Sequence, residues 1–158
     1  MPIAQHFHCA VTWAGATAGP TLDQKTFSRD ATISIAGQPP IAASAAQAYL
    51  GDPTRINPEE LFIASLALCQ MLSYLFLAAR RGVAVVGYAS NDDGELALQD
   101  GKMRMTQVTL RPTITIATTA DVTLAEELVA LAHDGCFIAN SVTCPVHLEP
   151  TILQAASD

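Results

Sequence analysis

The residues of this chain with the clearest reactive chemistry are its four cysteines, Cys9, Cys69, Cys136 and Cys144. A thiolate is a nucleophile and a metal ligand, so the surroundings of each thiol decide what it can do. No two of the cysteines have Cys-x-x-Cys spacing, which leaves a zinc site or a thioredoxin-type motif without support. We therefore expect no metal and no bound cofactor.

Composition limits the remaining possibilities. The chain has 158 residues and a net charge of −7, and its eight Lys and Arg residues are scattered, so we expect no nucleic-acid partner. Residues 1–5 lack the basic region and apolar run of a signal peptide, so a cytoplasmic location is expected. Thiols stay reduced there, which argues against a structural disulfide framework. With no break in composition, residues 1–158 are predicted to form a single domain.

A long helix is predicted around Cys69. Asn57 can cap its start, Glu60 stands three residues later like the acid of a capping box, and Gly82 fits a left-handed stop. From Leu61 to Ala79 the helix carries no charged residue. A helix that is apolar all round must be buried on every side or lie in lipid.

The stretch from Leu61 to Ala79 is long enough to span a bilayer. The cap and stop signals, the polar residues in the middle of the helix and the strand-rich remainder favour a soluble domain, so no membrane partner is expected. A small domain has difficulty covering such a helix on all sides. The simplest way to bury it is a second copy of the chain, so the sequence predicts a homodimer.

The rest of the chain reads as strands and one further helix. The second helix begins at Asp121 or Thr123, and a hairpin turn is predicted at Asp100–Gly101. Residues 41–50 are alanine-rich and ambiguous, and residues 15–20 form a loop. Strands are predicted at residues 6–13, 31–36, 83–88, 95–98, 103–118 and 143–153. This order is typical of an α+β fold with antiparallel sheets.

Two segments resemble the OsmC/Ohr family, which comprises osmotically inducible protein C and the organic hydroperoxide resistance proteins. The first is the run Asn57, Pro58, Glu59, Leu61, followed by Cys69 ten residues after that glutamate. The second is the Ala132, His133, Cys136 pattern after the second helix. The resemblance runs from Asn57 to the end of the chain, and the N-terminal strands match only loosely.

The resemblance implies an OsmC-like fold in an intertwined homodimer and a thiol-dependent peroxidase for small apolar organic hydroperoxides. Cys69 would form a sulfenic acid, Cys136 would convert it to an intramolecular disulfide, and an external dithiol would reduce that disulfide. Cys144 is the alternative resolving thiol, because it also lies in a Cys-Pro context that suits the family. The other functions left open are a non-catalytic dimer that binds an apolar ligand and a cysteine redox sensor.

Burial raises the pKa of a thiol, so a cation or hydrogen-bond donors must keep Cys69 ionised. In the family an N-terminal arginine held by the motif glutamate does this, which implies Glu59 and an arginine here. The loop at residues 15–20 carries no basic residue, so Arg29 is the preferred candidate and Arg55 the alternative. Glu59 and Cys69 are about 15 Å apart along one helix, so we expect Glu59 to serve the thiol of the other subunit. His133 is a further candidate base.

Overall fold

The computed structural model describes residues 4–13, 15 and 19–156. The predicted loop at residues 15–20 includes residues 16–18, which lie outside the described residues. Contacts divide the chain into two compact units, residues 1–61 and residues 62–158, and each unit is described by itself. The single-domain expectation stays a prediction.

The first unit contains an antiparallel sheet of order β1-β2-β3, formed by β1 (Ala10–Trp13), β2 (Ala31–Ser34) and β3 (Ile41–Ala43). The first two strands are shorter than predicted. Ala10 pairs with Ser34, after which the chain turns, so residues 6–9 have no strand to pair with. The ambiguous stretch at 41–50 divides into β3 and a 3-10 turn at Gln47–Tyr49.

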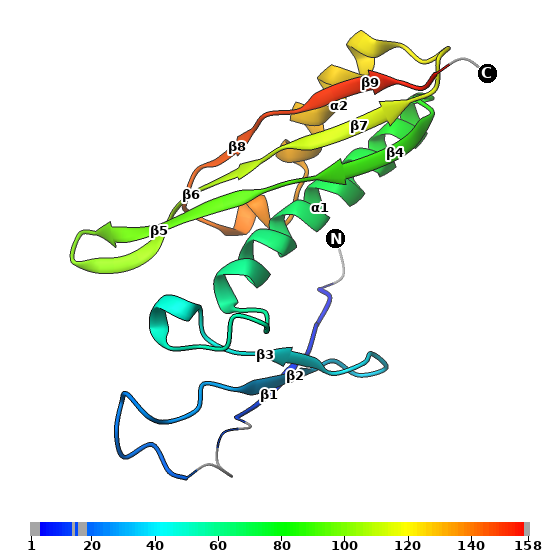
Figure 1. The fold of residues 1–158 in the computed structure, drawn as a ribbon. Helices are drawn as coiled ribbons and strands as arrows, with labels where there is room; N and C mark the ends of the chain where they lie inside the picture. The colour runs from blue at the N-terminus through cyan, green and yellow to red at the C-terminus, as the bar shows by residue number, and fades with distance from the viewer. Residues whose placement is uncertain (1–3, 14, 16–18, 157–158) are drawn as a thin grey trace. The chain divides into compact units, whose positions relative to one another are not determined.

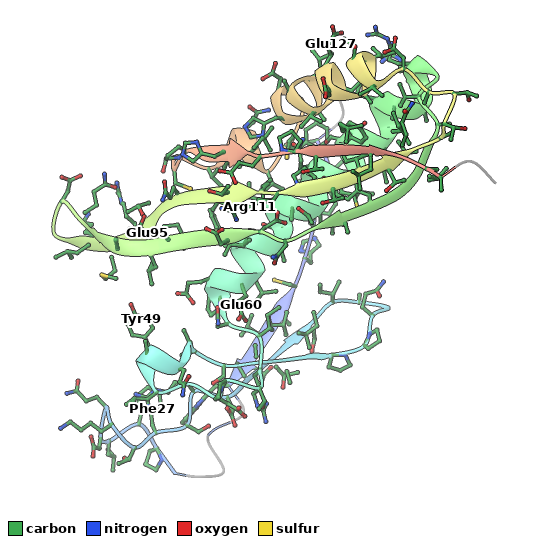
Figure 2. The ribbon with its side chains drawn as sticks, turned by 45° about the horizontal axis from the view of Figure 1, so that its top comes forward. Phe27, Tyr49, Glu60, Glu95, Arg111 and Glu127 are labelled. Atoms are coloured by element: carbon green, nitrogen blue, oxygen red, sulfur yellow. The ribbon has the colours of Figure 1, made fainter. Side chains whose placement is uncertain are left out.

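The long helix α1 (Pro58–Arg81) has the predicted start and stop. The Glu60 amide donates to Asn57 Oδ1 at 2.9 Å, and the Asn57 amide donates to Glu60 Oε2 at 3.0 Å, which is a reciprocal capping box. Figure 2 labels Glu60 at the start of the helix. Gly82 takes φ 76°, a left-handed conformation that ends the helix. Among the described residues α1 alone is long and apolar enough to cross a membrane, and 22% of its most apolar 18-residue window is buried.

The second unit contains two three-stranded sheets, which lie end to end (Figure 1). One has the order β4-β7-β9 and the other the order β5-β6-β8. The strands are β4 (Val85–Ser90), β5 (Asp93–Gln99), β6 (Lys102–Leu110), β7 (Pro112–Ile116), β8 (Val146–Leu148) and β9 (Thr151–Gln154). The hairpin at Asp100–Gly101 is confirmed: both residues have positive φ, as a type I′ turn requires.

The predicted α+β fold with a long helix and a second helix is confirmed. The pairs β4·β7 and β5·β6 are antiparallel as expected, but the sheets of the second unit are mixed. The pairs β6·β8 and β7·β9 are parallel. Parallel neighbours need a crossover connection, and α2 (Val122–Asp134) with the turn after it supplies one between β7 and β8. The sequence showed the helix, but no local signal showed which strand the returning chain would join.

Arg111 lies between the end of β6 and the start of β7. Figure 2 labels it there. Its amide donates to Asp92 Oδ1 at 2.7 Å, its Nε donates to Glu149 Oε2 at 2.8 Å, and its guanidinium pairs with Asp93. The expected interruption at Pro112 is thus a junction held by charge pairs, with Pro112 buried as the first residue of β7.

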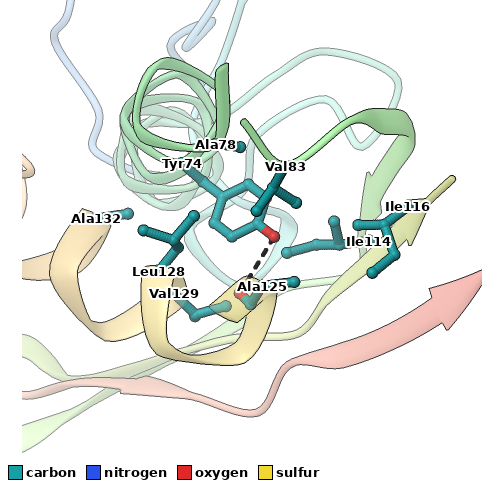
Figure 3. Packing of buried hydrophobic residues seen from close by; sticks show 9 residues of the cluster. All are labelled: Tyr74, Ala78, Val83, Ile114, Ile116, Ala125, Leu128, Val129 and Ala132. Atoms are coloured by element: carbon teal, nitrogen blue, oxygen red, sulfur yellow. Dashed lines mark hydrogen bonds between the residues drawn. The ribbon is translucent and has the colours of Figure 1, made fainter. Parts of the chain in front are cut away.

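Both helices of the second unit pack against one face of the strands (Figure 1). Asp121 caps α2 by accepting from the Leu124 amide at 3.1 Å. The larger core cluster joins α1, α2 and β7 through Tyr74, Ala78, Val83, Ile114, Ile116, Ala125, Leu128, Val129 and Ala132 (Figure 3). A smaller cluster surrounds Leu66, Val108 and Leu110. These clusters fix the positions of the middle of α1 and the end of α2.

Candidate active site

The structure brings Cys69 and Cys136 into contact within the second unit. Cys69 lies in the middle of α1 and is half-buried, whereas Cys136 is 1% exposed and follows α2 by two residues. All four cysteines of the chain are free thiols in the structure. One of the paired thiols is therefore accessible from outside, and the other is enclosed.

The Cys69 thiol has a lowered pKa. Burial acts to raise this pKa, but four hydrogen-bond donors together outweigh burial: the Cys136 thiol, the backbone amides of Ile138 and Phe137, and the Ser73 hydroxyl. Donors that point at a thiolate favour the charged form. The donor set thus favours ionised Cys69.

The Cys136 thiol has a raised pKa, chiefly because it is buried and also because it donates its proton toward Cys69. The Ala139 amide donates to Cys136 Sγ at 3.4 Å and opposes this change. The arrangement favours ionisation of Cys69 over ionisation of Cys136. This is the protonation pattern of a nucleophile beside a resolving thiol.

The turn that carries these donors is held by its own hydrogen bonds. The Cys136 amide donates to the His133 carbonyl at 3.0 Å, which continues from the end of α2. The Asn140 side chain donates to the Asp134 carbonyl at 2.8 Å, and the Asn140 amide donates to the Cys136 carbonyl at 3.0 Å. The amides of Phe137 and Ile138 are therefore fixed in place before any substrate arrives.

Two polar side chains of α1 near Cys69 reach α2. Gln70 Nε2 donates to the Val129 carbonyl at 3.1 Å, and the Tyr74 hydroxyl donates to the Ala125 carbonyl at 3.2 Å (Figure 3 shows the Tyr74 bond). Gln70 is 1% exposed and Tyr74 is 0% exposed. Burial raises the pKa of the Tyr74 hydroxyl, so this group stays a neutral donor.

A family model for OsmC-like proteins matches residues 51–151 of the chain, well over half of its length. The chain belongs to the OsmC-like family.

Solved structures agree with this assignment. An OsmC-like protein of unknown function from Vibrio cholerae is 33% identical to this chain, with a TM-score of 0.85, and the match covers 93% of this chain and 99% of the other. An organic hydroperoxide resistance protein from Legionella pneumophila shares the fold at 18% identity, with a TM-score of 0.66 and coverage of 95% and 99%. Another from Elizabethkingia anophelis shares it at 15% identity, with a TM-score of 0.68 and coverage of 97% and 100%. No curated protein sequence matches.

In this OsmC-like protein the predicted arginines make local contacts within the first unit. The Arg29 guanidinium donates to the carbonyls of Phe27 and Gln24 and lies 4.0 Å from the centre of the Phe27 ring. Arg55 pairs with Asp52 at 3.2 Å and with Asp30 at 3.6 Å. The donors that lower the Cys69 pKa are neutral groups of the second unit, so that shift does not depend on either arginine.

Glu59 lies in the first turn of α1, and its Oε2 is buried without a hydrogen-bond partner among the described residues. An unpaired buried carboxylate oxygen is costly and calls for a donor. This fits the predicted part of Glu59 in holding an arginine. His133 also has a buried ring nitrogen, Nδ1, without a partner among the described residues, and its backbone carbonyl accepts from Cys136.

Cys144 lies in the smaller core cluster and is half-buried. It lines a separate groove of about 660 Å³ with Phe62 and Arg104. The thiol that donates to Cys69 is that of Cys136, which agrees with the preference for Cys136 as the resolving residue. Among the described residues no cluster of three or more His, Cys, Asp or Glu side chains has the geometry to hold a metal ion.

Sequence reasoning missed the Ser73 hydroxyl and the two turn amides as donors to Cys69. Ser73 could have been found, since it stands one helical turn after Cys69, where side chains share a face. The amides of Phe137 and Ile138 had no side-chain signal, because their effect depends on how the turn after α2 folds over α1.

Proposed function

We propose that this protein reduces organic hydroperoxides with Cys69 as the nucleophile and Cys136 as the resolving thiol. The Cys69 thiolate attacks the distal oxygen of ROOH, the O–O bond breaks, and with one proton the products are Cys69–SOH and ROH. Cys136–SH then displaces water from the sulfenic acid to give a Cys69–Cys136 disulfide. An external dithiol reduces the disulfide by exchange and becomes oxidised itself.

The observation that carries this proposal is the contact between a half-buried Cys69 of lowered pKa and a buried Cys136 of raised pKa. A single buried thiol packed as a small apolar group would not need four hydrogen-bond donors. The accessible thiol is the one that favours ionisation, as a nucleophile requires.

The surface around Cys69 favours an apolar substrate. Phe137, whose amide lowers the pKa of Cys69, is 82% exposed. Apolar walls with a few placed polar groups are typical of sites for apolar ligands. We therefore propose alkyl or aryl hydroperoxides as substrates.

A turnover assay tests the function. Reduced protein with cumene hydroperoxide and a dithiol should consume hydroperoxide at a rate proportional to enzyme concentration, and the Cys69→Ser variant should not. Cys9→Ser is the matched control, because Cys9 is an exposed thiol outside the site. Turnover that survives in Cys69→Ser would contradict the proposal.

We also propose that the protein is a homodimer joined through α1. Ala64, Leu68, Leu72 and Phe76 recur every four residues and form one exposed apolar stripe on this helix. Such a stripe is costly in water, and a second copy of the helix would cover it. Sedimentation should give twice the chain mass, and Leu72→Glu with Phe76→Glu should reduce it to one chain. Glu127→Gln, an exposed change on α2, should leave the dimer intact.

A dimer also gives Glu59 and Arg29 a role. Since Glu59 and Cys69 are about 15 Å apart along α1, we propose that Glu59 and Arg29 of one subunit complete the site around Cys69 of the other. Arg29→Lys and Glu59→Gln should then each lower kcat/KM by at least about tenfold. Arg55→Lys is the matched control and should have little effect.

A further inference from the structure

We propose that Gln70 and Tyr74 are positioning residues that set the register of α2 on α1 and so align Cys136 with Cys69. This inference rests on the proposed function for its consequence in the reaction. The proposed role of the two side chains does not require contact with either sulfur atom. They act through the helix that carries Cys136 to its place.

The two hydrogen bonds form a regular pair. Gln70 and Tyr74 are four residues apart on α1, and the carbonyls they reach, Val129 and Ala125, are four residues apart on α2 in the opposite order. One helical turn of α1 is thus matched to one helical turn of an antiparallel α2. The next carbonyl along this series, that of His133, accepts the Cys136 amide at 3.0 Å.

The rest of the contact between the helices is apolar and includes small residues. The core cluster there contains Ala78, Ala125, Leu128, Val129 and Ala132. Apolar packing of this kind supplies burial, but it does not strongly select one register. Buried polar residues are the best-attested means of selecting one register between packed helices. Gln70 and Tyr74 are the side chains of α1 that meet this description at the contact with α2.

Register matters here because α2 ends only two residues before Cys136. A slip of one turn would move the turn that follows α2 by about 5.4 Å along α1. The groups of Cys136, Phe137 and Ile138 that lower the pKa of Cys69 would then move away from its sulfur. A displacement far smaller than one turn is already enough to disturb a bond-forming contact.

The state of the Gln70 amide supports a specifying role. Its Oε1 is buried without a partner among the described residues, while its Nε2 is paired. An apolar side chain of similar size would fill the same space without an unpaired carbonyl oxygen. Stability alone therefore does not account for a glutamine at this place, and the fixed register does.

The step that depends on this alignment is disulfide closure. Cys69–SOH and Cys136–SH form the S–S bond and release one water molecule, and the two sulfur atoms must be in contact for this to occur. Attack on the hydroperoxide is made by the Cys69 thiolate and does not involve the sulfur of Cys136. Loss of register should therefore slow closure much more than attack, when both are measured at a pH where Cys69 is fully ionised.

The test compares the two steps in the full-length reduced protein with one equivalent of cumene hydroperoxide. Hydroperoxide loss reports attack, and the mass of the alkylated protein reports closure. In the variant carrying both Gln70→Met and Tyr74→Phe, we expect closure to slow by about tenfold or more while attack changes little. With excess hydroperoxide this variant should accumulate the sulfinic acid of Cys69.

Two matched controls separate positioning from general loosening. Tyr88→Phe removes a hydroxyl from the ring that packs against Tyr74 at 6.1 Å between centroids, and Leu128→Ala loosens the same helix contact with both hydrogen bonds kept. Both should keep the wild-type ratio of closure to attack.

If the double variant does not fold, Tyr74→Phe alone decides the test. Closure at the wild-type rate in the double variant or in Tyr74→Phe would overturn the inference. Equal slowing of closure in Leu128→Ala would overturn it as well.

A second oxidant separates this inference from the proposed function. Diamide oxidises two thiols to a disulfide and is itself reduced to a hydrazine, so it drives closure of Cys69 and Cys136 without a hydroperoxide. If the wild-type protein fails to consume hydroperoxide, the proposed function fails. Slower closure with diamide in the double variant than in Leu128→Ala would still support the positioning role, and equal rates would refute it.

Discussion

The middle of α1 and the turn after α2 each carry one thiol, and the two regions treat their thiols in opposite ways. Burial raises the pKa in both. Around Cys69, donors from Ser73 and from the turn outweigh burial and lower the pKa. The Cys136 thiol instead acts as a hydrogen-bond donor to Cys69, so the pKa of Cys136 stays raised.

This difference shows that the roles of the two thiols do not follow from burial or from helix position alone. They follow from the direction in which hydrogen bonds point at the place where the two regions meet. The turn after α2 supplies the backbone amides of Phe137 and Ile138 and the Cys136 thiol, so one short segment both favours ionised Cys69 and provides the thiol that resolves it.

The largest expected effect comes from removing each thiol in turn. Cys69→Ser should reduce hydroperoxide turnover by at least about 1000-fold, because the nucleophile is gone. Cys136→Ser should complete the attack once, then stop turning over through the disulfide and accumulate over-oxidised Cys69. Turnover assays and intact-protein mass spectrometry measure these outcomes. Equal behaviour of the two variants would remove the contrast between the two regions.

A smaller effect is expected when the donor at position 136 is changed. Cys136→Ala removes a donor to Cys69, whereas Cys136→Ser keeps a hydroxyl that can donate. The pKa of Cys69 should therefore be higher in the alanine variant, and its rate of iodoacetamide alkylation near neutral pH should be about threefold to tenfold lower than in the serine variant. Identical pH profiles for the two variants would show that the thiol of Cys136 does not support ionisation of Cys69.

The smallest effect should appear in the pH dependence of stability under reducing conditions. The pKa of Cys69 is lowered in the folded protein, so its contribution to stability is fully present above the pKa of the unfolded thiol and is lost as pH falls through the folded pKa. Cys136 has a raised folded pKa, so its contribution is lost as pH rises above about 8.5.

Urea midpoints for wild type, Cys69→Ser and Cys136→Ser between about pH 6 and pH 10 would test these signs. The advantage of wild type over Cys69→Ser should grow as pH rises toward 8.5. Its advantage over Cys136→Ser should shrink at higher pH. Because the two thiols titrate together, only these differences between variants are assigned to either residue. If the two advantages of wild type change in the same direction as pH rises, the account is contradicted.

The elements near the site were readable from sequence because their signals are local. The capping box of Asn57 and Glu60, the stop at Gly82 and the turn at Asp100–Gly101 are set by residues a few positions apart. The resemblance also supplied Cys69 and Cys136, which the structure brings together. These parts of the fold and the site required no knowledge of long-range contacts.

What sequence could not supply is set by distant contacts. The parallel pairing of β8 with β6 and of β9 with β7 depends on where the chain returns after α2. The strand predicted at residues 6–13 is shorter in the structure because its partner strand ends at Ser34. The sequence predicted that a cation or hydrogen-bond donors would keep Cys69 ionised, but it could not name the amides of Phe137 and Ile138, since backbone amides leave no trace in a residue pattern. Arg29 and Glu59 stay predictions.

The most direct test of the central claim is to identify the disulfide that forms after reduced protein receives one equivalent of cumene hydroperoxide. Peptide mass spectrometry should show Cys69 joined to Cys136, with Cys9 and Cys144 still free. A Cys69–Cys144 disulfide, or an oxidised protein in which Cys69 remains a free thiol, would contradict the account.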